Sequence, residues 1–246
     1  GMGIYLAAQR QRMSLLEELN QINDVLIHRV RDTKFRSYGR LLSGFSETKI
    51  DELLTYMDRH TAIPESGNCY VASVNELEQL SIFEDFQNVT YGGMPIQMGY
   101  CNGRNSTYNG FEYFKCIELN IAVTDFMLVL GHSYDIREDG FYDNADAEVF
   151  FVEKGDIIEM YQTTLHLSPI RVSEEGFKDV VVLPQGTNTP LKDRSSIGRN
   201  DVESKLLLQT NKWVIAHPMR KPLIDQGAFP GIIGLNKELY YPKEHK

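Results

Sequence analysis

The stretch GDIIEMYQTTLH, from Gly155 to His166, decides how this chain is expected to fold. It follows the run VFFVEK, so a strand, a tight turn at the glycine and a second strand, IIEMY, are predicted before a short segment that ends at the histidine. A histidine in that position can point into the mouth of a β-barrel, where neutral imidazole is a natural metal ligand. The stretch therefore predicts antiparallel β-structure with a candidate site residue at its end.

The same pattern continues through residues 86–185, which we expect to form the barrel. Short apolar or alternating runs are separated by turn residues roughly every eight to twelve positions. These runs are PIQMGYC, NGFEYFKCIELNIA, FMLVLGH, AEVFFVE, DIIEMY, LHLSPIRV and VVVLPQG. Such spacing favours a mainly β fold, a barrel or double-sheet jelly roll, over alternating βαβ units.

Helical spacing dominates residues 1–85, which are predicted to be a helical segment packed on the barrel. Apolar residues recur from Leu15 to Ile27 behind Ser14, a candidate N-cap, and a second amphipathic helix follows Ser46. A short third helix is expected over residues 74–80. Residues 186–246 are predicted to be a C-terminal extension on the barrel, because its large apolar side chains need burial.

Composition narrows the class of protein. The chain has 246 residues and a formal charge of −9, which argues against the basic footprint of a nucleic-acid-binding surface. No apolar run approaches the roughly 18–20 residues that span a bilayer, so no membrane partner is expected. The three cysteines, without paired spacing, are expected to be free thiols. Together with the apparent lack of a signal peptide, they favour a cytoplasmic protein.

Strand alternation in NGFEYFKCIELN groups the first candidate site residues. Glu112, Phe114, Cys116 and Glu118 would share one face of a continuous strand, opposite the face that begins with Tyr113. Two ionised glutamates inside a barrel are costly unless they are paired or bound to a metal. Alternation alone leaves either face free to point inward.

Two motifs in this chain resemble those of the cupin superfamily. The second cupin motif reads Gly-x5-Pro-x-Gly-x2-His; Gly155 and His166 match it, while Tyr161 and Thr163 replace its proline and second glycine. The first cupin motif has the core His-x-His-x3-Glu. Glu118 aligns with its glutamate, and Glu112 and Phe114 stand at its two histidines. The resemblance implies a cupin-like double-stranded β-helix with Glu118 pointing inward.

The stretch from about Phe35 to Asn236 also resembles an uncharacterised bacterial family of cupin-like proteins, a domain of unknown function. The segments that carry this likeness are KFRSYGRLL, YGGMPIQMGYCNG, VVVLPQGTNTPL and NKWVIAHP. That family's strand reads Glu-Tyr-His-Lys-x-x-Glu, whereas this chain has EYFKCIE, so Phe114 replaces a histidine. A more distant similarity to ureidoglycolate lyase-type barrels implies a metal-free variant of the same chemistry.

The resemblance implies a metal-assisted site. Glu118 and His166 are the predicted ligands of a divalent transition metal, with Zn, Mn, Fe and Ni all open. Such a metal would polarise a substrate oxygen, while Glu112, Glu118 and Tyr161 carry out acid–base steps between adjacent carbons. Gln97, Phe114 and Glu159 are the predicted substrate-binding residues.

Two functions remain open from the sequence. The first is an isomerase or lyase for a sugar or hydroxy acid. The second is a non-catalytic carbohydrate-binding or sensing protein, in which the Phe114 ring stacks on a sugar after loss of the metal. In either case we expect a small, sugar-like ligand. A third reading is a structural homodimer in which the barrel serves as an interaction platform. A homodimer is expected in any case, because cupins commonly pair through sheet edges.

Overall fold

The computed structural model describes residue 2 and residues 13–195, 197–198 and 201–243. Its largest sheet is six-stranded, with the order β2-β10-β6-β12-β4-β3. Its strands are β2 (Gly39–Leu41), β10 (Ile157–Met160), β6 (Glu118–Ala122), β12 (Phe177–Pro184), β4 (Ile96–Gly103) and β3 (Asn68–Val71). All of these neighbours pair antiparallel.

A four-stranded sheet with the order β1-β9-β7-β11 faces it. Its strands are β1 (Ile27–Arg29), β9 (Glu148–Val152), β7 (Phe126–His132) and β11 (Thr164–Leu165). An antiparallel bridge between Glu112 and His166 adds β5 (Gly110–Tyr113) beside β11. The orders β4-β12-β6-β10 and β5-β11-β7-β9 make a jelly roll, in which the chain winds back and forth between two sheets. The expected mainly β, cupin-like fold with an N-terminal helical segment is confirmed.

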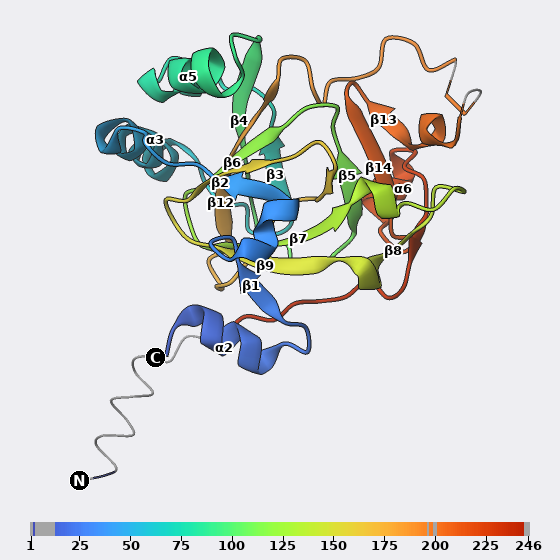
Figure 1. The fold of residues 1–246 in the computed structure, drawn as a ribbon, viewed down its shortest axis with the longest axis horizontal. Coiled ribbons are helices and arrows are strands. Elements are labelled where there is room, and N and C mark those ends of the chain that lie inside the picture. The colour runs from blue at the N-terminus through green and yellow to red at the C-terminus, as the bar shows by residue number, and fades with distance from the viewer. Residues whose placement is uncertain (1, 3–12, 196, 199–200, 244–246) are drawn as a thin grey trace.

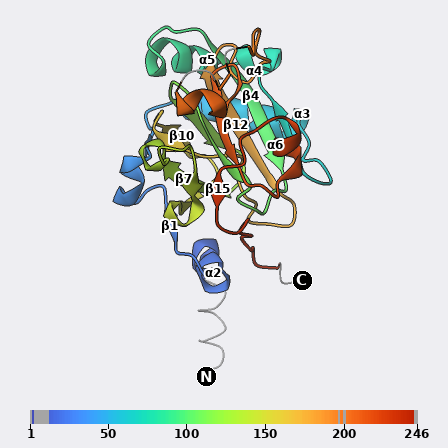
Figure 2. The same ribbon diagram turned by 90° about the vertical axis from the view of Figure 1, so that its right-hand side faces the viewer.

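Helices and short strands cover the two sheets (Figures 1 and 2). α3 and α5 lie along the six-stranded sheet, and α2 lies at the opposite end of the molecule from α5 in both views. These helices are α2 (Leu15–Ile22), α3 (Glu47–His60), α4 (Asn75–Glu78) and α5 (Ser81–Asp85). β13 (Leu207–Gln209) and β14 (Lys212–Ala216) extend β5, β8 (Tyr142–Asp143) pairs with β15 (Ile232–Ile233), and α6 spans Lys221–Asp225.

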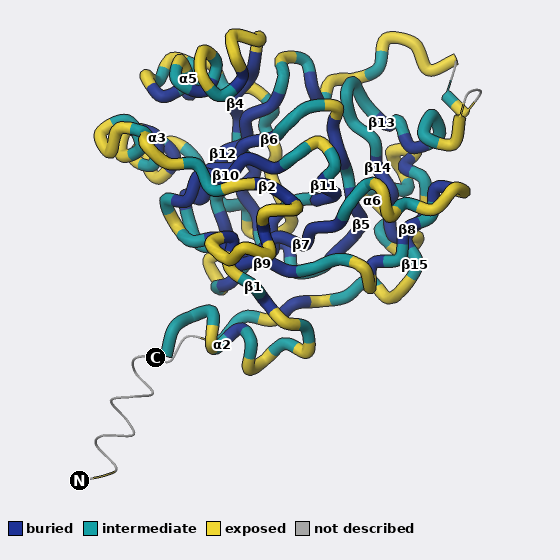
Figure 3. The backbone as a smooth tube through the Cα atoms, viewed as in Figure 1, coloured by how far each residue is buried: buried dark blue, intermediate teal, exposed yellow. Residues whose placement is uncertain are grey.

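The core has an interior layer and two exterior layers. Phe114, Phe126, Phe150 and Val181 pack inside the barrel. A second cluster joins the helices to the outer face of the six-stranded sheet, and a third covers the outer face of the four-stranded sheet. Figure 3 shows much of β4, β6, β7 and β12 as buried and the outward sides of α3 and α5 as exposed. The interior layer is incomplete at one end of the barrel, where polar side chains replace apolar ones.

The predicted helix starts agree with the structure, but the first predicted helix is too long. The hydroxyl of Ser14 accepts from the Glu17 N–H at 3.2 Å, as expected for an N-cap. The helix ends at Ile22 because the following residue, Asn23, turns its side-chain amide back to the Leu19 carbonyl. Ile27 therefore belongs to β1, where it pairs with β9.

The prediction of one continuous strand through NGFEYFKCIELNIA is wrong. β5 ends at Tyr113 and β6 begins at Glu118, because the chain crosses here from one sheet to the other. Glu112 and Glu118 still face the same interior, but the crossing turns Cys116 outward into the cluster beneath the helices. Cys116 is therefore removed from the set that alternation had placed on one face.

The three predicted segments share hydrogen-bonded sheets. β2 and β3, from residues 1–85, form both edges of the six-stranded sheet, and β14, from residues 186–246, pairs with β5. All three cysteines are free, as expected. Within the described part of the chain, no helix is long and apolar enough to cross a membrane.

Candidate functional site

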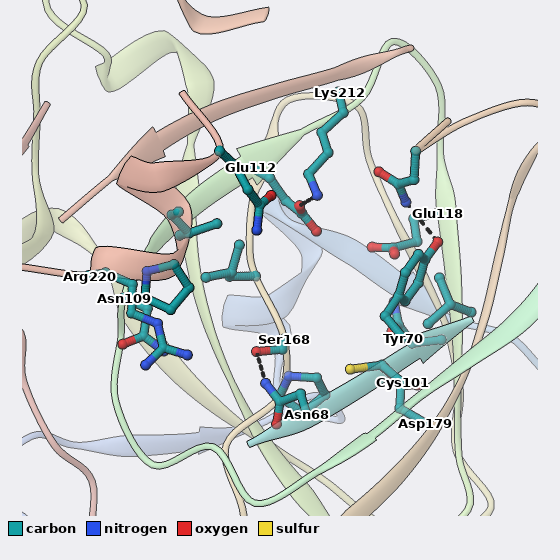
Figure 4. A pocket seen from close by; sticks show the side chains of 18 residues that line it. Asn68, Tyr70, Cys101, Asn109, Glu112, Glu118, Ser168, Asp179, Lys212 and Arg220 are labelled. Atoms are coloured by element: carbon teal, nitrogen blue, oxygen red, sulfur yellow. Dashed lines mark hydrogen bonds and ion pairs between the residues drawn. The ribbon is translucent and has the colours of Figure 1, made fainter. Parts of the chain in front are cut away.

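A cavity of about 280 Å³ opens at the polar end of the barrel interior. Its walls come from β3, β4, β5, β6, β12 and β14, from the segment after β11, and from α6 with its flanking residues. Figure 4 shows Glu112, Glu118, Lys212 and Arg220 around this cavity. These residues meet because several strands that are not consecutive in the sequence end at the same mouth of the jelly roll.

Two carboxyl side chains reach the cavity by strand alternation. Glu118 and Asn120 face inward on β6, and Asp179 faces inward on β12, where Val181 continues the same face into the apolar core. Glu118 is 6% exposed and Asp179 is 1% exposed. With its amide nitrogen toward Asp179, Asn120 donates to both carboxylate oxygens, at 2.5 and 3.1 Å.

Burial changes the protonation of both acids. It raises the pKa of Glu118 well above its usual value, and repulsion from Glu112 raises it further. Burial also raises the pKa of Asp179 well above the usual range, with Glu118 as the second cause. Both shifts favour the neutral, protonated carboxyl group.

His166 connects Glu112 and Glu118. Its backbone and that of Glu112 exchange two hydrogen bonds, at 2.6 and 3.0 Å, so the bridge places both side chains on one face. The imidazole Nε2 lies 3.1 Å from Glu118 Oε2, and Nδ1 lies 3.9 Å from Glu112 Oε1. Burial lowers the pKa of His166 to about 4, so the ring is neutral at neutral pH.

Glu118 Oε2 is a buried oxygen with no hydrogen bond among the described residues. His166 Nε2 is close to it, but without the alignment of a hydrogen bond. A buried polar atom without a partner costs about 1–3 kcal/mol, and more when it is charged, so this position favours the neutral carboxyl group. The geometry therefore agrees with the raised pKa of Glu118.

Two cations enter the site from the C-terminal extension. Lys212, at the start of β14, places its Nζ 3.3 Å from Glu112 Oε2. Arg220 lines the cavity from the turn before α6. His217 holds this turn: its Nε2 lies 2.8 Å from the Gly234 carbonyl oxygen, and its Nδ1 accepts from the Met219 N–H at 3.1 Å.

The structure brings together Glu112, Glu118 and His166, although His166 itself is not part of the cavity wall, and it places the other four predicted residues elsewhere. Gln97 faces inward, but its amide is used by the loop after β12: Nε2 donates to the Thr187 carbonyl, and Oε1 accepts from the Gly186 N–H. Phe114 is 2% exposed in the interior apolar core, 5.4 Å from the His166 ring. Neither residue contributes to the cavity wall.

Glu159 and Tyr161 also lie outside that wall. Glu159 pairs across the sheet with Leu119, whose side chain packs beneath the helices, and it forms an ion pair with Arg40 at 3.3 Å. The Tyr161 N–H donates to the Tyr38 carbonyl at 2.9 Å, just after the end of β10. The roles predicted for these two side chains stay predictions.

The donor set does not fit a resident catalytic metal. Glu118 and His166, the predicted ligands, do meet, but a catalytic zinc site has three protein ligands. The described residues hold no group of three or more His, Cys, Asp or Glu side chains arranged to bind a metal ion. Glu112 approaches the other ring nitrogen of His166, and Phe114 occupies the remaining motif position with an apolar ring.

Asp179, Lys212 and Arg220 were missed from the sequence. Asp179 had a detectable signal, because it alternates with Phe177, Val181 and Leu183 on an otherwise apolar strand face. Lys212 and Arg220 follow no comparable pattern. They reach the cavity because β14 pairs with β5.

A family model described as a domain of unknown function (DUF4867) matches residues 27–237. A comparison with curated proteins found no match. Among solved structures, oxalate decarboxylase of Bacillus subtilis is similar at 10% identity with a TM-score of 0.28, covering 40% of this chain and 24% of that one. Salicylate 1,2-dioxygenase of Pseudoaminobacter salicylatoxidans is similar at 12% identity with a TM-score of 0.28, covering 55% and 30%. Hazelnut (Corylus avellana) vicilin has 4% identity and a TM-score of 0.31, covering 55% and 29%.

Proposed function

The chain belongs to this DUF4867 family, whose description assigns no activity, and we propose that its barrel cavity is the active site of a small-molecule isomerase or lyase. Its substrate would be a sugar or hydroxy acid. The cavity volume of about 280 Å³ lies just below the usual range of roughly 300–1,000 Å³ for small-molecule sites. A compact metabolite therefore fits better than a polymer.

The observation that carries this proposal is the pair of carboxyl groups on either side of His166. Both Glu112 and Glu118 line the cavity, but their surroundings differ. Glu118 is buried with a raised pKa, whereas Glu112 forms an ion pair with Lys212. Two carboxyl groups in such different environments support separate acid and base roles.

In an isomerase, the Glu112 carboxylate accepts a proton from the carbon beside a carbonyl group. The Glu118 carboxylic acid gives its proton to the carbonyl oxygen, which produces an enediol. Glu118 then takes the proton from the neighbouring hydroxyl, and Glu112 returns its proton to the other carbon. The neutral ring of His166 holds the two carboxyl groups apart without adding a charge.

A lyase would use the same two groups differently. Glu118 would protonate a hydroxyl that leaves as water, while Glu112 removes a proton from the adjacent carbon. The similarity to ureidoglycolate lyase-type barrels stays a prediction that favours this branch. Neither route uses the predicted divalent metal as a reactant.

Solvent isotope exchange tests the proposal. The protein would be incubated in deuterated water with a panel of aldoses, ketoses, sugar acids and small hydroxy acids, and ¹H NMR would follow loss of each carbon-bound proton. Glu118→Gln and Glu112→Gln should each lower the exchange rate by about 10²–10⁴-fold, the usual contribution of a positioned acid or base. Glu148→Gln, on β9 and paired with Lys34, is the matched control and should exchange normally. Unchanged exchange in both site variants would refute the assignment.

The carbohydrate-binding alternative is less well supported. Its aromatic platform, Phe114, is enclosed in the apolar interior and offers no face to a ligand in the cavity. The homodimer and the cytoplasmic location stay predictions. Size-exclusion chromatography with light scattering would give the oligomeric state directly.

A further inference from the structure

Arg220 is a positively charged side chain in the cavity wall that forms no ion pair with another described residue. It lies half-buried in the wall, and Figure 4 shows it across the cavity from Glu118 and Tyr70. Among the described residues, its guanidinium group makes neither an ion pair nor a hydrogen bond. A guanidinium group stays charged at all ordinary pH values and presents five donors in a fixed plane. Such a group beside a ligand-sized cavity is ready to accept an anion.

The turn that carries Arg220 is firmly held. The Arg220 N–H donates to the His217 carbonyl at 2.9 Å, and His217 is fixed by Gly234 and Met219 as described above. Pro222 follows within the first turn of α6 and also lines the cavity. The backbone beneath Arg220 is thus set before a ligand arrives, which lowers the entropy cost of binding.

The positive charge of Arg220 is not neutralised by an ion pair with any of the described carboxylates around the cavity. Lys212 is already paired with Glu112. Glu118 and Asp179 have other neighbours: Glu118 Oε2 lies 3.1 Å from His166 Nε2, and Asp179 accepts from the Asn120 amide. The cavity therefore carries a local positive charge at Arg220, although the whole chain has a formal charge of −9.

We propose that Arg220 binds the carboxylate of the substrate, which makes the substrate a sugar acid or another hydroxy acid rather than a neutral sugar. This inference rests on the proposed function and deepens it by naming the substrate class. A planar carboxylate matches the guanidinium fork in a bidentate pair. The hydroxyl-bearing carbons would then extend across the cavity toward Glu112 and Glu118.

A carboxylate fits this site better than a phosphate group. A phosphate dianion needs more positive charge than one arginine supplies, or a cradle of free backbone N–H groups. The neighbouring N–H groups are already used, since those of Arg220 and Lys221 donate to the carbonyls of His217 and Met219. Sugar phosphates therefore serve as the contrasting ligand class in the test.

Binding of matched ligand pairs tests the proposal. Isothermal titration calorimetry at neutral pH would compare D-glucuronate with D-glucose, D-gluconate with sorbitol, and D-glucose 6-phosphate with D-glucose. Wild-type protein should bind at least one acid about 10–100-fold more tightly than its neutral partner, as expected for a charge-assisted pair. Arg220→Gln should remove that preference, and Arg220→Lys should restore part of it.

Lys221→Gln is the matched control, because it removes the same charge one residue later. Lys221 is exposed, pairs with Asp225 and is not part of the cavity wall. This variant should keep the preference for acids. Equal binding of acid and neutral partners, failure of every acid to bind, tighter binding of the phosphate, or an unchanged preference in Arg220→Gln would each overturn the inference.

Failure of this inference is distinguishable from failure of the proposed function. Arg220-dependent binding of acids without isotope exchange would retain the carboxylate site and reject the isomerase or lyase. Isotope exchange into neutral sugars at a rate that is the same in Arg220→Gln and wild type would support the isomerase or lyase assignment and reject carboxylate binding at Arg220.

Discussion

Replacing Glu118 with glutamine should stabilise the protein increasingly as the pH rises. Burial raises the pKa of Glu118 above its ordinary value of 4.5, so the folded protein keeps a proton that the unfolded chain releases. Between the ordinary and the raised pKa, the free energy of unfolding therefore falls as the pH rises. The limiting slope for one such group is about 1.4 kcal/mol per pH unit.

Glutamine carries no titratable group, so the free energy of unfolding of the variant does not fall with rising pH for this reason. Relative to wild type, the free energy of unfolding of Glu118→Gln should rise by up to about 2 kcal/mol between pH ~5.5 and pH ~7. For a chain of this length, that corresponds to about 4–8 °C in Tm. His166, whose pKa of about 4 lies below its ordinary 6.5, contributes stability that rises with pH over that interval. It is present in both proteins and largely cancels in the difference.

Urea unfolding gives the required free energies at each pH. Trp213, the chain's one tryptophan, stacks on Tyr113 at 5.6 Å and reports unfolding by fluorescence. Glu148→Gln, which removes a carboxyl group paired with Lys34 on a partly exposed strand face, serves as the matched control. A difference between Glu118→Gln and wild type that stays constant with pH, or that shrinks as the pH rises, would show that Glu118 is ionised in the folded protein.

Three further predictions concern the fold and the metal. Gly99→Ala should lower the free energy of unfolding by about 1–3 kcal/mol or more, because a Cβ there would overlap the Val71 carbonyl oxygen. Normal thermal stability would contradict this close approach. Tyr91→Phe should lower the free energy of unfolding, measured in urea, by about 1–2 kcal/mol, because the buried Tyr91 hydroxyl lies 2.8 and 3.0 Å from two carbonyl oxygens. An unchanged free energy of unfolding would mean that these contacts contribute nothing. Elemental analysis of the purified protein should find less than one equivalent of Zn, Mn, Fe or Ni per chain, because the two predicted protein ligands are too few for a catalytic metal site. A full equivalent that is lost in a Glu118→Ala, His166→Ala double variant would refute this prediction.

Much of the fold could be predicted because it depends on local patterns. Ser14 and Ser46 begin their helices where the apolar spacing starts, and the side chains of both cap them. The glycine turn at Gly155 joins β9 to β10, as the alternating runs on either side indicate. Glu112, Glu118 and His166 also meet, in agreement with the motif spacing.

Three residues, Glu159, Cys116 and Gln97, lie outside the cavity wall for a common physical reason. Alternation identifies which residues share a strand face, but it does not tell which face points inward or where a strand ends. Glu159 therefore faces the helical layer although its neighbour Met160 faces the interior, and Cys116 turns outward where the chain changes sheets. A rim residue such as Gln97 can face inward and still be used by a loop rather than by the cavity.

The sequence by itself determined the β class and the helix starts, because each depends on neighbours within one strand, helix or turn. The resemblance to the cupin motifs, rather than a local pattern, singled out Glu112, Glu118 and His166. Tertiary structure alone decided that Lys212 and Arg220 join them, since these residues reach the cavity only when β14 pairs with β5. It also decided the protonation of the site. The raised pKa of Glu118 and the lowered pKa of His166 arise from burial and from charges on other strands, which no local pattern encodes.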